Sequence, residues 1–446
     1  MIDLNLIILK FSQVIWSWPL IITFIVIGVL TTVMLYFVQF RYFLASWKFA
    51  LFPSKEKTEG ELSPFQALIN AIGVSTGNGS IAGIATAIAV GGPGAAFWIL
   101  IAGIFSLAIR FAEVYLATSI QDINPLTKKM GGGPMVYMEK IPGGRILTYL
   151  FTIFTVIFGI IAGSSMQSNS ISSGIFRTWQ INPYIIAVVL FVFITYVLIG
   201  GAKRIITISD KLVPFKVSVF IISSLIVLLY NYANLLPAIK LMFISAFNPE
   251  AIGGAALGFT IQQAISKGFS HLLTANEAGL GTVPILFGAS GSKNPMKDSI
   301  MSMLSAFIST YLVCFVVALC IVSSGVWNSG EASTALTISA FETVFGSYGG
   351  WIVTFCSVSF GLGVLVSYAF VTLETWLYIT KGRWTYLFIA LYCIATFFGA
   401  IAKVDLVWNL INIINAAMLL INLYAILYFL PFIRKNVATY IKQHEQ

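Results

Sequence analysis

Long runs of apolar residues alternate with short polar segments along almost the whole chain. Because about 20 apolar residues cross a bilayer as a helix, each run predicts a membrane span. We place about eleven spans at residues 15–39, 65–90, 94–120, 146–173, 183–200, 212–233, 252–288, 297–325, 350–380, 384–402 and 406–431. The seventh run is too long for one straight span, which predicts an interruption within it.

The second run contains a glycine-rich segment, Gly73–Gly83, with the sequence GVSTGNGSIAG. Glycine costs roughly 1 kcal/mol in a helix interior relative to alanine, so this segment predicts a broken helix. Irregular backbone at membrane depth is tolerated only where it is buried in protein or lines a cavity. Broken helices near the midplane are typical of binding sites in secondary transporters. We therefore expect a break at about Ser75–Ser80 that faces a central cavity.

The two interrupted runs lie five spans apart, with the second break expected between Ser266 and Gly281. Since five is odd, the two runs cross the membrane in opposite directions, as in an inverted five-plus-five repeat. The predicted fold is an all-α integral membrane protein of about 11 transmembrane helices. We divide it into an extra N-terminal helix at 1–40, a first repeat at 65–233, a second repeat at 252–431 and a cytoplasmic tail at 432–446.

Composition and charge narrow the possible functions. The 446 residues are 58% hydrophobic and only 9% charged, whereas soluble domains carry about 25% charged residues. The net charge of +9 does not indicate nucleic-acid binding, because 19 of the 25 Lys and Arg residues fall on one side of the predicted spans. The positive-inside rule places the N-terminus outside and the C-terminus in the cytoplasm of a multi-pass protein of the cell membrane.

An enzyme is not expected from this sequence. Ser, His and carboxylate positions lack a recognised catalytic spacing, and the four cysteines lack metal-ligand spacing. The segment Gly131–Pro134 is not followed by the Gly-Lys-Ser/Thr of a phosphate-binding loop. No cofactor is expected beyond a coupling sodium ion or proton, and no metal ligands are assigned.

A set of short motifs occurs in a fixed order between about residues 65 and 430. They are Ile81–Trp98 (IAGIATAIAVGGPGAAFW), Phe111–Glu113 (FAE), Gly132–Glu139 (GGPMVYME), Gln167–Ser170 (QSNS), Val213–Phe215 (VPF), Asn276–Gly281 (NEAGLG), Met418 and Asn422. The set resembles the alanine/glycine:cation symporter family of the amino acid–polyamine–organocation superfamily. The resemblance implies a leucine-transporter-like fold and symport of a small neutral amino acid, such as alanine or glycine, with sodium.

The first break is the main candidate for the substrate site. Exposed N–H groups at the start of a half-helix, with its partial positive charge, suit a carboxylate. We expect Gly77, Asn78 and Gly79, together with Thr76, to bind it; the alternative is a notch for helix packing.

Two polar side chains and one alanine complete the candidate site. The resemblance implies that Gln167 lines the pocket, with interhelical hydrogen bonding as the alternative. Asn169, close by, is expected to be structural. Asn276 at the second break fits substrate binding and stabilisation of the break equally well. Ala369 matches a family tryptophan, which predicts a wider pocket.

The coupling ion is the point at which the chain departs most from the family. Sodium, a hard cation, needs oxygen ligands, but a match anchored on Glu374 puts Val364 and Leu365 where the family has Ser and Thr. Lys216 follows the VPF motif in place of methionine, and its ammonium could replace the ion, as in sodium-independent relatives of the superfamily. The alternatives are oxygens from Ser357, Ser359 or Ser367, and a Lys216 that extends to the cytoplasmic surface.

Four further ionisable groups are expected inside the membrane. His271 and Lys267 lie four residues apart in the seventh span. If a proton is the coupling ion, Lys216 and His271 are alternative carriers of it, because histidine titrates near neutral pH. The alternative for Lys267 is an ion pair with a carboxylate. Arg110 and Glu113, three apart, are expected to form a structural pair.

These features together predict a secondary transporter of a small neutral amino acid in the lipid bilayer. The alternative is a non-transporting amino-acid sensor on the same fold. The sequence does not predict the oligomeric state.

Overall fold

The computed structural model describes residues 15–16, 18–52, 59–123, 130–248, 260–402 and 405–444. Within these ranges the chain is helical apart from loops and one small hairpin, in which β1 (Gln121–Ile123) pairs antiparallel with β2 (Met130–Gly132). The start of the predicted N-terminal segment and of the second repeat, at 252, lie outside the described residues.

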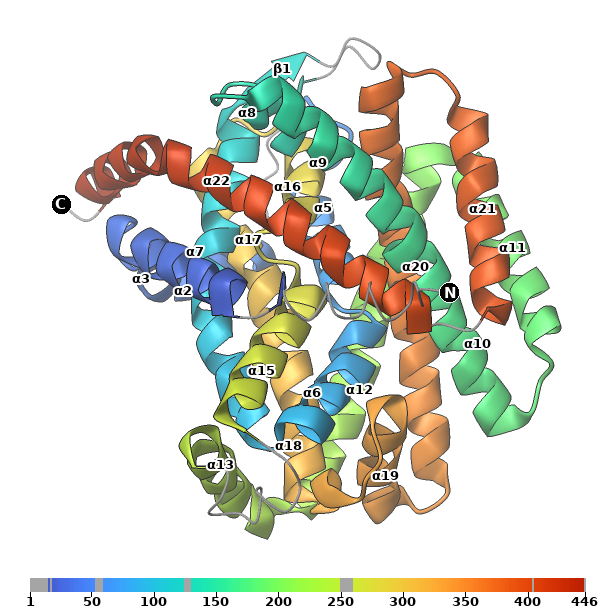
Figure 1. The fold of residues 1–446 in the computed structure, drawn as a ribbon. Coiled ribbons are helices and arrows are strands. Elements are labelled where there is room, and N and C mark those ends of the chain that lie inside the picture. Colours follow the sequence, from blue (N-terminus) through green and yellow to red (C-terminus); the bar gives the residue numbers. More distant parts are fainter. Residues whose placement is uncertain are drawn as a thin grey trace, which may run out of the picture.

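The helices follow one another along the whole chain, and Figure 1 shows their arrangement. Their bounds are α2 (Trp18–Met34), α3 (Val38–Arg41), α4 (Phe43–Leu51), α5 (Pro64–Ser75), η1 (Gly79–Gly83), α6 (Ile84–Gly91), α7 (Gly94–Ser119), α8 (Pro134–Met138), α9 (Gly144–Phe158), η2 (Gly159–Ser165), α10 (Met166–Trp179), α11 (Pro183–Ile199), α12 (Gly201–Tyr230), α13 (Tyr232–Phe247), α15 (Ile261–Asn276), α16 (Thr282–Gly288), α17 (Pro295–Phe307), η4 (Ile308–Cys314), α18 (Phe315–Ser323), η5 (Val326–Asn328), α19 (Ser333–Phe345), α20 (Tyr348–Thr380), α21 (Thr385–Ile401) and α22 (Asp405–His444).

Six continuous helical segments in the described part of the chain are long and apolar enough to cross a membrane. They are Gly94–Ser119, Gly144–Trp179, Gly201–Tyr230, Pro295–Ser323, Tyr348–Thr380 and Ile411–His444. Shorter apolar helices, such as α2 and α11, accompany them. The all-α membrane fold is therefore confirmed, while the number of spans stays a prediction.

The second predicted span is broken, as expected, but over fewer residues. A capping box formed by Ser63 and Gln66 starts α5, which ends at Ser75. Thr76 leaves the helical region, and π-helical winding begins again at Gly79. The non-helical stretch is therefore centred on Thr76 and Gly77 rather than extending over 75–80.

The seventh predicted span is broken within the expected interval. A second capping box, formed by Thr260 and Gln263, starts α15, which ends at Asn276. Gly279 and Gly281 then have φ values of 84° and 82°, in the left-handed region that glycine adopts at low cost. The chain becomes helical again at α16.

The two broken helices run in opposite directions through the centre of the molecule. In Figure 1, α5 and α16 lie nearer the end that carries β1, whereas α6 and α15 lie nearer the end that carries α13 and α19. The chain therefore runs away from the β1 end through α5 and α6 and toward it through α15 and α16. This is the antiparallel relation that the odd number of intervening spans predicted.

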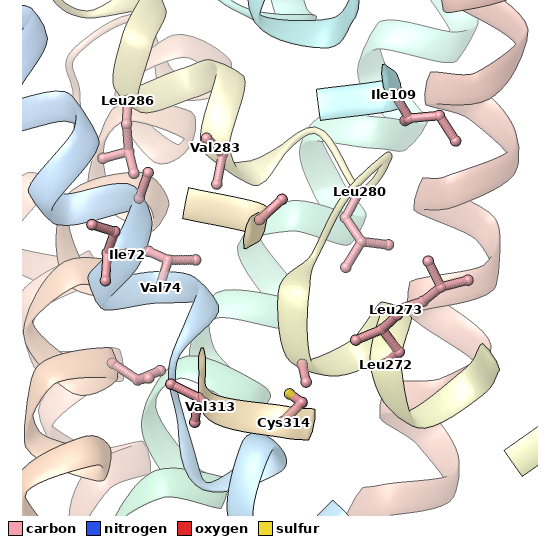
Figure 2. Packing of buried hydrophobic residues seen from close by; sticks show 14 of the residues in the cluster. Ile72, Val74, Ile109, Leu272, Leu273, Leu280, Val283, Leu286, Val313 and Cys314 are labelled. Carbon is pink, nitrogen blue, oxygen red and sulfur yellow. The ribbon is translucent and has the colours of Figure 1, made fainter. Parts of the chain in front are cut away.

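Both breaks are buried in protein. Figure 2 shows apolar side chains from α5, α15, α16 and η4 packed around them, including Val74, Leu273 and Val313. η1, η2 and η4 are π-helical, and such segments are rare and frequent at functional sites. The irregular backbone therefore lies where a membrane protein tolerates it.

Candidate functional site

A small cavity lies beside the first break, between four stretches of helix. Its volume is about 20 Å³. It is lined by Val74, Gly77, Gly79, Phe158, Ala162, Met166, Gln167, Thr274, Ala275, Glu277, Val364 and Tyr368. The lining thus comes from both breaks, from the π-helical region at η2 and from α20.

Gln167 is held at the cavity wall by a chain of hydrogen bonds. Its Oε1 accepts from the backbone N–H and from Nδ2 of Asn78, both at 3.4 Å, and its Nε2 donates to the Ala162 carbonyl at 3.1 Å. Asn78 Oδ1 in turn accepts from Ser357 Oγ at 2.7 Å. These partners fix the amide of Gln167 against the turn at Gly77.

Gly77 allows a close approach that a side chain would prevent. A Cβ atom there would lie 2.7 Å from Val364 Cγ2 and 3.5 Å from Gln167 Oε1. At Gly79 the nearest atom to such a Cβ would be Ala275 Cα at 4.0 Å, which is ordinary contact. Of the two glycines, only Gly77 is required by the packing of the cavity.

The carbonyls at the broken end of α5 accept hydrogen bonds from side chains of other helices. The last carbonyls of a helix have no partner within it and carry a partial negative charge. Lys216 Nζ donates to the carbonyls of Gly73 at 3.0 Å and Thr76 at 2.6 Å, and Ser309 Oγ donates to that of Ser75. Lys216 is fully buried, so it does not extend to the surface.

The broken end of α15 is held by an ion pair. Arg110 Nη2 donates to the Asn276 carbonyl at 2.6 Å, and Arg110 Nη1 lies 2.7 Å from Glu113 Oε1 with both side chains fully buried. The other carboxylate oxygen, Glu113 Oε2, accepts from the Gly281 N–H and from Asn422 Nδ2. Arg110 and Glu113 are thus in contact, and they also tie α7 to the second break.

Both polar atoms of the Asn276 side chain form hydrogen bonds within the protein. Its Nδ2 donates to Thr310 Oγ1 at 3.1 Å, and its Oδ1 accepts from the Ala278 N–H at 3.0 Å. Asn276 does not line the cavity. Of the two roles that the sequence left open, this geometry favours stabilisation of the break.

The predicted site residues are only partly brought together. Gly77, Gly79 and Gln167 line the cavity, whereas Asn78 reaches it only through its bonds to Gln167. Thr76 lies at the break, where its hydroxyl donates to the Ile72 carbonyl.

Ala369 is the remaining residue of the predicted site. This residue is fully buried and does not line the cavity, while the preceding residue, Tyr368, does. An aromatic side chain therefore lies at this wall of the cavity.

Other residues of α20 lie close to Lys216 or line the cavity. Leu365 directs its carbonyl to the Tyr392 hydroxyl at 2.8 Å, and Val364 lines the cavity. The position nearest the ammonium is Gly363, where a Cβ would lie 2.5 Å from Lys216 Nζ. The hydroxyls of Ser357 and Ser367 are bonded to Asn78 and Ser209, respectively.

His271 and Lys267 lie away from this cavity. Both are on α15, which is continuous through them, and both are half-buried. A Cβ at Gly83 would lie 3.3 Å from His271 Nδ1. No carboxylate within the described ranges forms an ion pair with Lys267, and no cluster of metal-ligating side chains occurs among the same residues.

Residues that were not predicted as substrate ligands make up much of the lining. Glu277 is the most important, because it places a carboxylate between the two breaks; its Oε2 accepts from Thr282 Oγ1 at 2.6 Å. Its position within NEAGLG was a usable signal. Phe158 ends α9, and Ala162 lies in the π-helical segment η2, which a sequence pattern does not reveal.

Comparison with known proteins places this arrangement in context. The model of the sodium:alanine symporter family matches residues 1–446. An uncharacterized transporter of Haemophilus influenzae is 32% identical over 436 residues, which cover 96% of this chain and 94% of that protein. The sodium/alanine symporter AgcS of Methanococcus maripaludis is 30% identical over 425 residues, which cover 93% and 92%.

A solved structure supports the fold independently. A Na⁺-coupled sialic acid symporter, in a substrate-bound outward-open state, superposes with a TM-score of 0.58 over 88% of this chain and 86% of that one. The two sequences are 11% identical, so the likeness shows the fold alone. It confirms the transporter fold that the sequence predicted. This multi-pass membrane protein belongs to the sodium:alanine symporter family, a family of transporters and not of enzymes.

Proposed function

We propose that this protein is a secondary active transporter that carries a small neutral amino acid, such as alanine or glycine, across the cell membrane together with a cation. The observation that carries this proposal is the cavity between the two broken helices, lined by Gly77, Gln167 and Glu277. AgcS, whose name describes a sodium/alanine symporter, supports the substrate class.

Both ends of an amino acid find complementary charge around this cavity. The helix Gly79–Gly91 begins at its edge, and the partial positive charge of that end favours the substrate carboxylate. The broken end of α15 and the Glu277 side chain lie on another wall and favour the ammonium group. The apolar side chains of Val364 and Phe158 also line the cavity and favour a small apolar substrate side chain.

Transport requires the two halves of the molecule to move against each other. We infer that 65–233 and 252–431 form these halves, with the N-terminus outside and the C-terminus in the cytoplasm. Labelling a Lys442→Cys variant from each side of the membrane tests the orientation; labelling from outside alone would contradict it.

Uptake of radiolabelled alanine into proteoliposomes tests the proposed function. We expect accumulation above equilibrium when an inward gradient of sodium or of protons is imposed, and none when ionophores abolish both gradients. Binding of alanine without accumulation under either gradient would indicate a sensor instead of a transporter.

Replacing Gly77 by alanine is expected to weaken alanine binding by at least about tenfold, because the new methyl group would overlap Val364 and fill the cavity. Gly174→Ala is the control, since this glycine of α10 lies outside the cavity and a Cβ there would lie 3.5 Å from Thr354 Cγ2, an ordinary contact. Isothermal titration calorimetry on both variants measures the difference. Equal affinities would contradict the placement of the substrate beside Gly77.

A further inference from the structure

The helix α4 is too short to cross a membrane. It has 9 residues and is about 14 Å long, whereas the hydrocarbon core of a bilayer is about 30 Å thick. Tyr36 and Phe37, with φ values of 58° and 56°, lie in the left-handed region and interrupt the helix after α2. The Phe43 ring centroid lies 4.8 Å from that of Phe307 on α17. This short segment therefore packs against the side of the bundle.

The outward face of α4 mixes basic and apolar side chains. Leu44 is 81% exposed and Leu51 is 67% exposed, and Lys48 between them is exposed as well. The three residues lie four and three positions apart, so they share one face of the helix. Water disfavours the leucines, and the hydrocarbon core disfavours the lysine. The mixture fits the boundary between headgroups and acyl chains, where a long lysine side chain reaches the headgroups.

The end of α22 lies beside this segment. The ring centroids of Tyr42 and Tyr440 are 5.8 Å apart, and Arg434 Cζ lies 5.9 Å from the centre of the Tyr36 ring. Figure 1 shows α3 and the C-terminal end of α22 at the same edge of the molecule. Two segments from opposite ends of the sequence thus form one surface.

The last turns of α22 have a packed face and a basic face. Ile433 and Val437 are fully buried, whereas Arg434, Lys435 and Lys442 are exposed. Lys435 and Lys442 lie seven positions apart, which is nearly two full turns, so they lie on the same side of the helix. The basic side chains of α22 therefore add to those of the α3–α4 segment.

The charge at this edge has one sign. Residues 18–52 and 411–444 contain no Asp or Glu. Their Lys and Arg residues are Arg41, Lys48, Arg434, Lys435 and Lys442. We call these five residues, together with Leu44 and Leu51, the basic edge. On the adjoining α17, Lys297 Nζ lies 5.4 Å from the centre of the Phe49 ring, and the neighbouring Asp298 is buried.

We propose that the basic edge is a docking surface for negatively charged phospholipids, with the headgroup phosphates bound by its Lys and Arg side chains and the acyl chains in contact with Leu44 and Leu51. Each basic residue beside a membrane contributes roughly fivefold to the affinity for anionic lipid. A free anion would leave the two leucines uncovered, and a second copy of this chain would bring like charges together. This inference concerns neither the substrate nor the coupling ion, so it stands or falls independently of the proposed function.

Titration of the detergent-purified protein with phosphatidylglycerol and with phosphatidylcholine, followed by native mass spectrometry, tests the inference. Phosphatidylglycerol is expected to bind the wild type at least about 25-fold more tightly than phosphatidylcholine does, since at least two basic residues contact its headgroup. In Arg434→Gln/Lys435→Gln this affinity is expected to fall by roughly 10- to 25-fold, because two contributions are lost.

Lys140→Gln/Lys240→Gln is the matched control, because it removes the same charge from two exposed positions outside the basic edge. It is expected to bind phosphatidylglycerol as tightly as the wild type does. Equal affinities of the wild type for the two lipids, or equal losses in the two double variants, would overturn the inference.

Substitutions at Leu44 test the same surface without changing the core, because this side chain is almost fully exposed. Leu44→Glu is expected to weaken phosphatidylglycerol binding by roughly fivefold, and Leu44→Lys to strengthen it by about the same factor. The melting temperature without lipid is expected to change by less than about 2 °C in both, as for most surface substitutions. Equal responses to the two substitutions would contradict recognition of the headgroup by charge.

Inorganic phosphate distinguishes a lipid from a free anion. At millimolar concentration it is expected to leave phosphatidylglycerol bound, since it has no acyl chains to contact the leucines. If inorganic phosphate displaces the lipid from the wild type, the basic edge is a site for a free anion, and the proposed docking of phospholipid is wrong.

Discussion

Replacing Gln167 by alanine is expected to weaken alanine binding by roughly 10- to 100-fold while the protein still folds. A hydrogen bond to a charged group contributes about 1.5–3 kcal/mol, which corresponds to this range. The amide lies at the cavity wall and is oriented by Asn78 and Ala162, so its loss removes a polar contact and also frees the turn at Gly77. Calorimetric titration of purified protein measures the effect.

Asn169→Ala is the matched control for this prediction. Asn169 lies two residues farther along α10 and donates to the carbonyls of Gly399 at 2.9 Å and Ala402 at 2.7 Å, away from the cavity. Its loss is expected to lower stability and leave the affinity of the folded protein unchanged. If Gln167→Ala binds alanine as tightly as the control does, Gln167 is not a substrate ligand.

Arg110→Met is expected to destabilise the protein by about 3–5 kcal/mol, because it leaves the fully buried carboxylate of Glu113 without its partner. The variant also removes the donor to the Asn276 carbonyl at the second break. Thermal unfolding in detergent, followed by tryptophan fluorescence or by light scattering, measures the loss. We expect Arg110→Met/Glu113→Gln to recover part of it, since the charge is then removed.

Lys293→Met is the control, because it removes an ion pair that is exposed and not buried. Lys293 Nζ lies 2.6 Å from Glu59 Oε1, but the two side chains are 78% and 52% exposed. Exposed ion pairs contribute at most about 1 kcal/mol, so this variant is expected to unfold almost as the wild type does. A loss in Arg110→Met no larger than in Lys293→Met would mean that the buried pair does not hold the second break.

The broken helices were predictable because their cause is local. Glycine and small polar residues disfavour the helix wherever they occur in an apolar run, and the odd number of spans between the two runs fixed their opposite directions. The exact length of the first break was not predictable, since π-helical winding starts again at Gly79 and involves hydrogen bonds that no residue pattern encodes.

The site was harder to predict from the sequence than the broken helices, because it is assembled from segments that lie far apart in the chain. Gly77 and Gln167 lie 90 positions apart, and Val364 a further 197 beyond Gln167, yet all three line one cavity. One residue along a helix turns a side chain by about 100°, so that Tyr368 lines the cavity while its neighbour Ala369 does not. That Lys216 is buried also depends on Gly363, a contact between helices that cannot be read from either helix alone.

The small volume of the cavity has a consequence for selectivity. A space of about 20 Å³ holds one or two water molecules, so even the smallest amino acid must spread the surrounding helices as it enters. The measured affinity is then the affinity of the spread conformation multiplied by the fraction of protein molecules that adopt this conformation without substrate. Each additional methylene group on the substrate requires a more widely spread conformation of the protein, which is less populated. Discrimination between amino acids would thus arise from the free energy needed to spread the surrounding helices, in addition to the hydrogen bonds that all α-amino acids share.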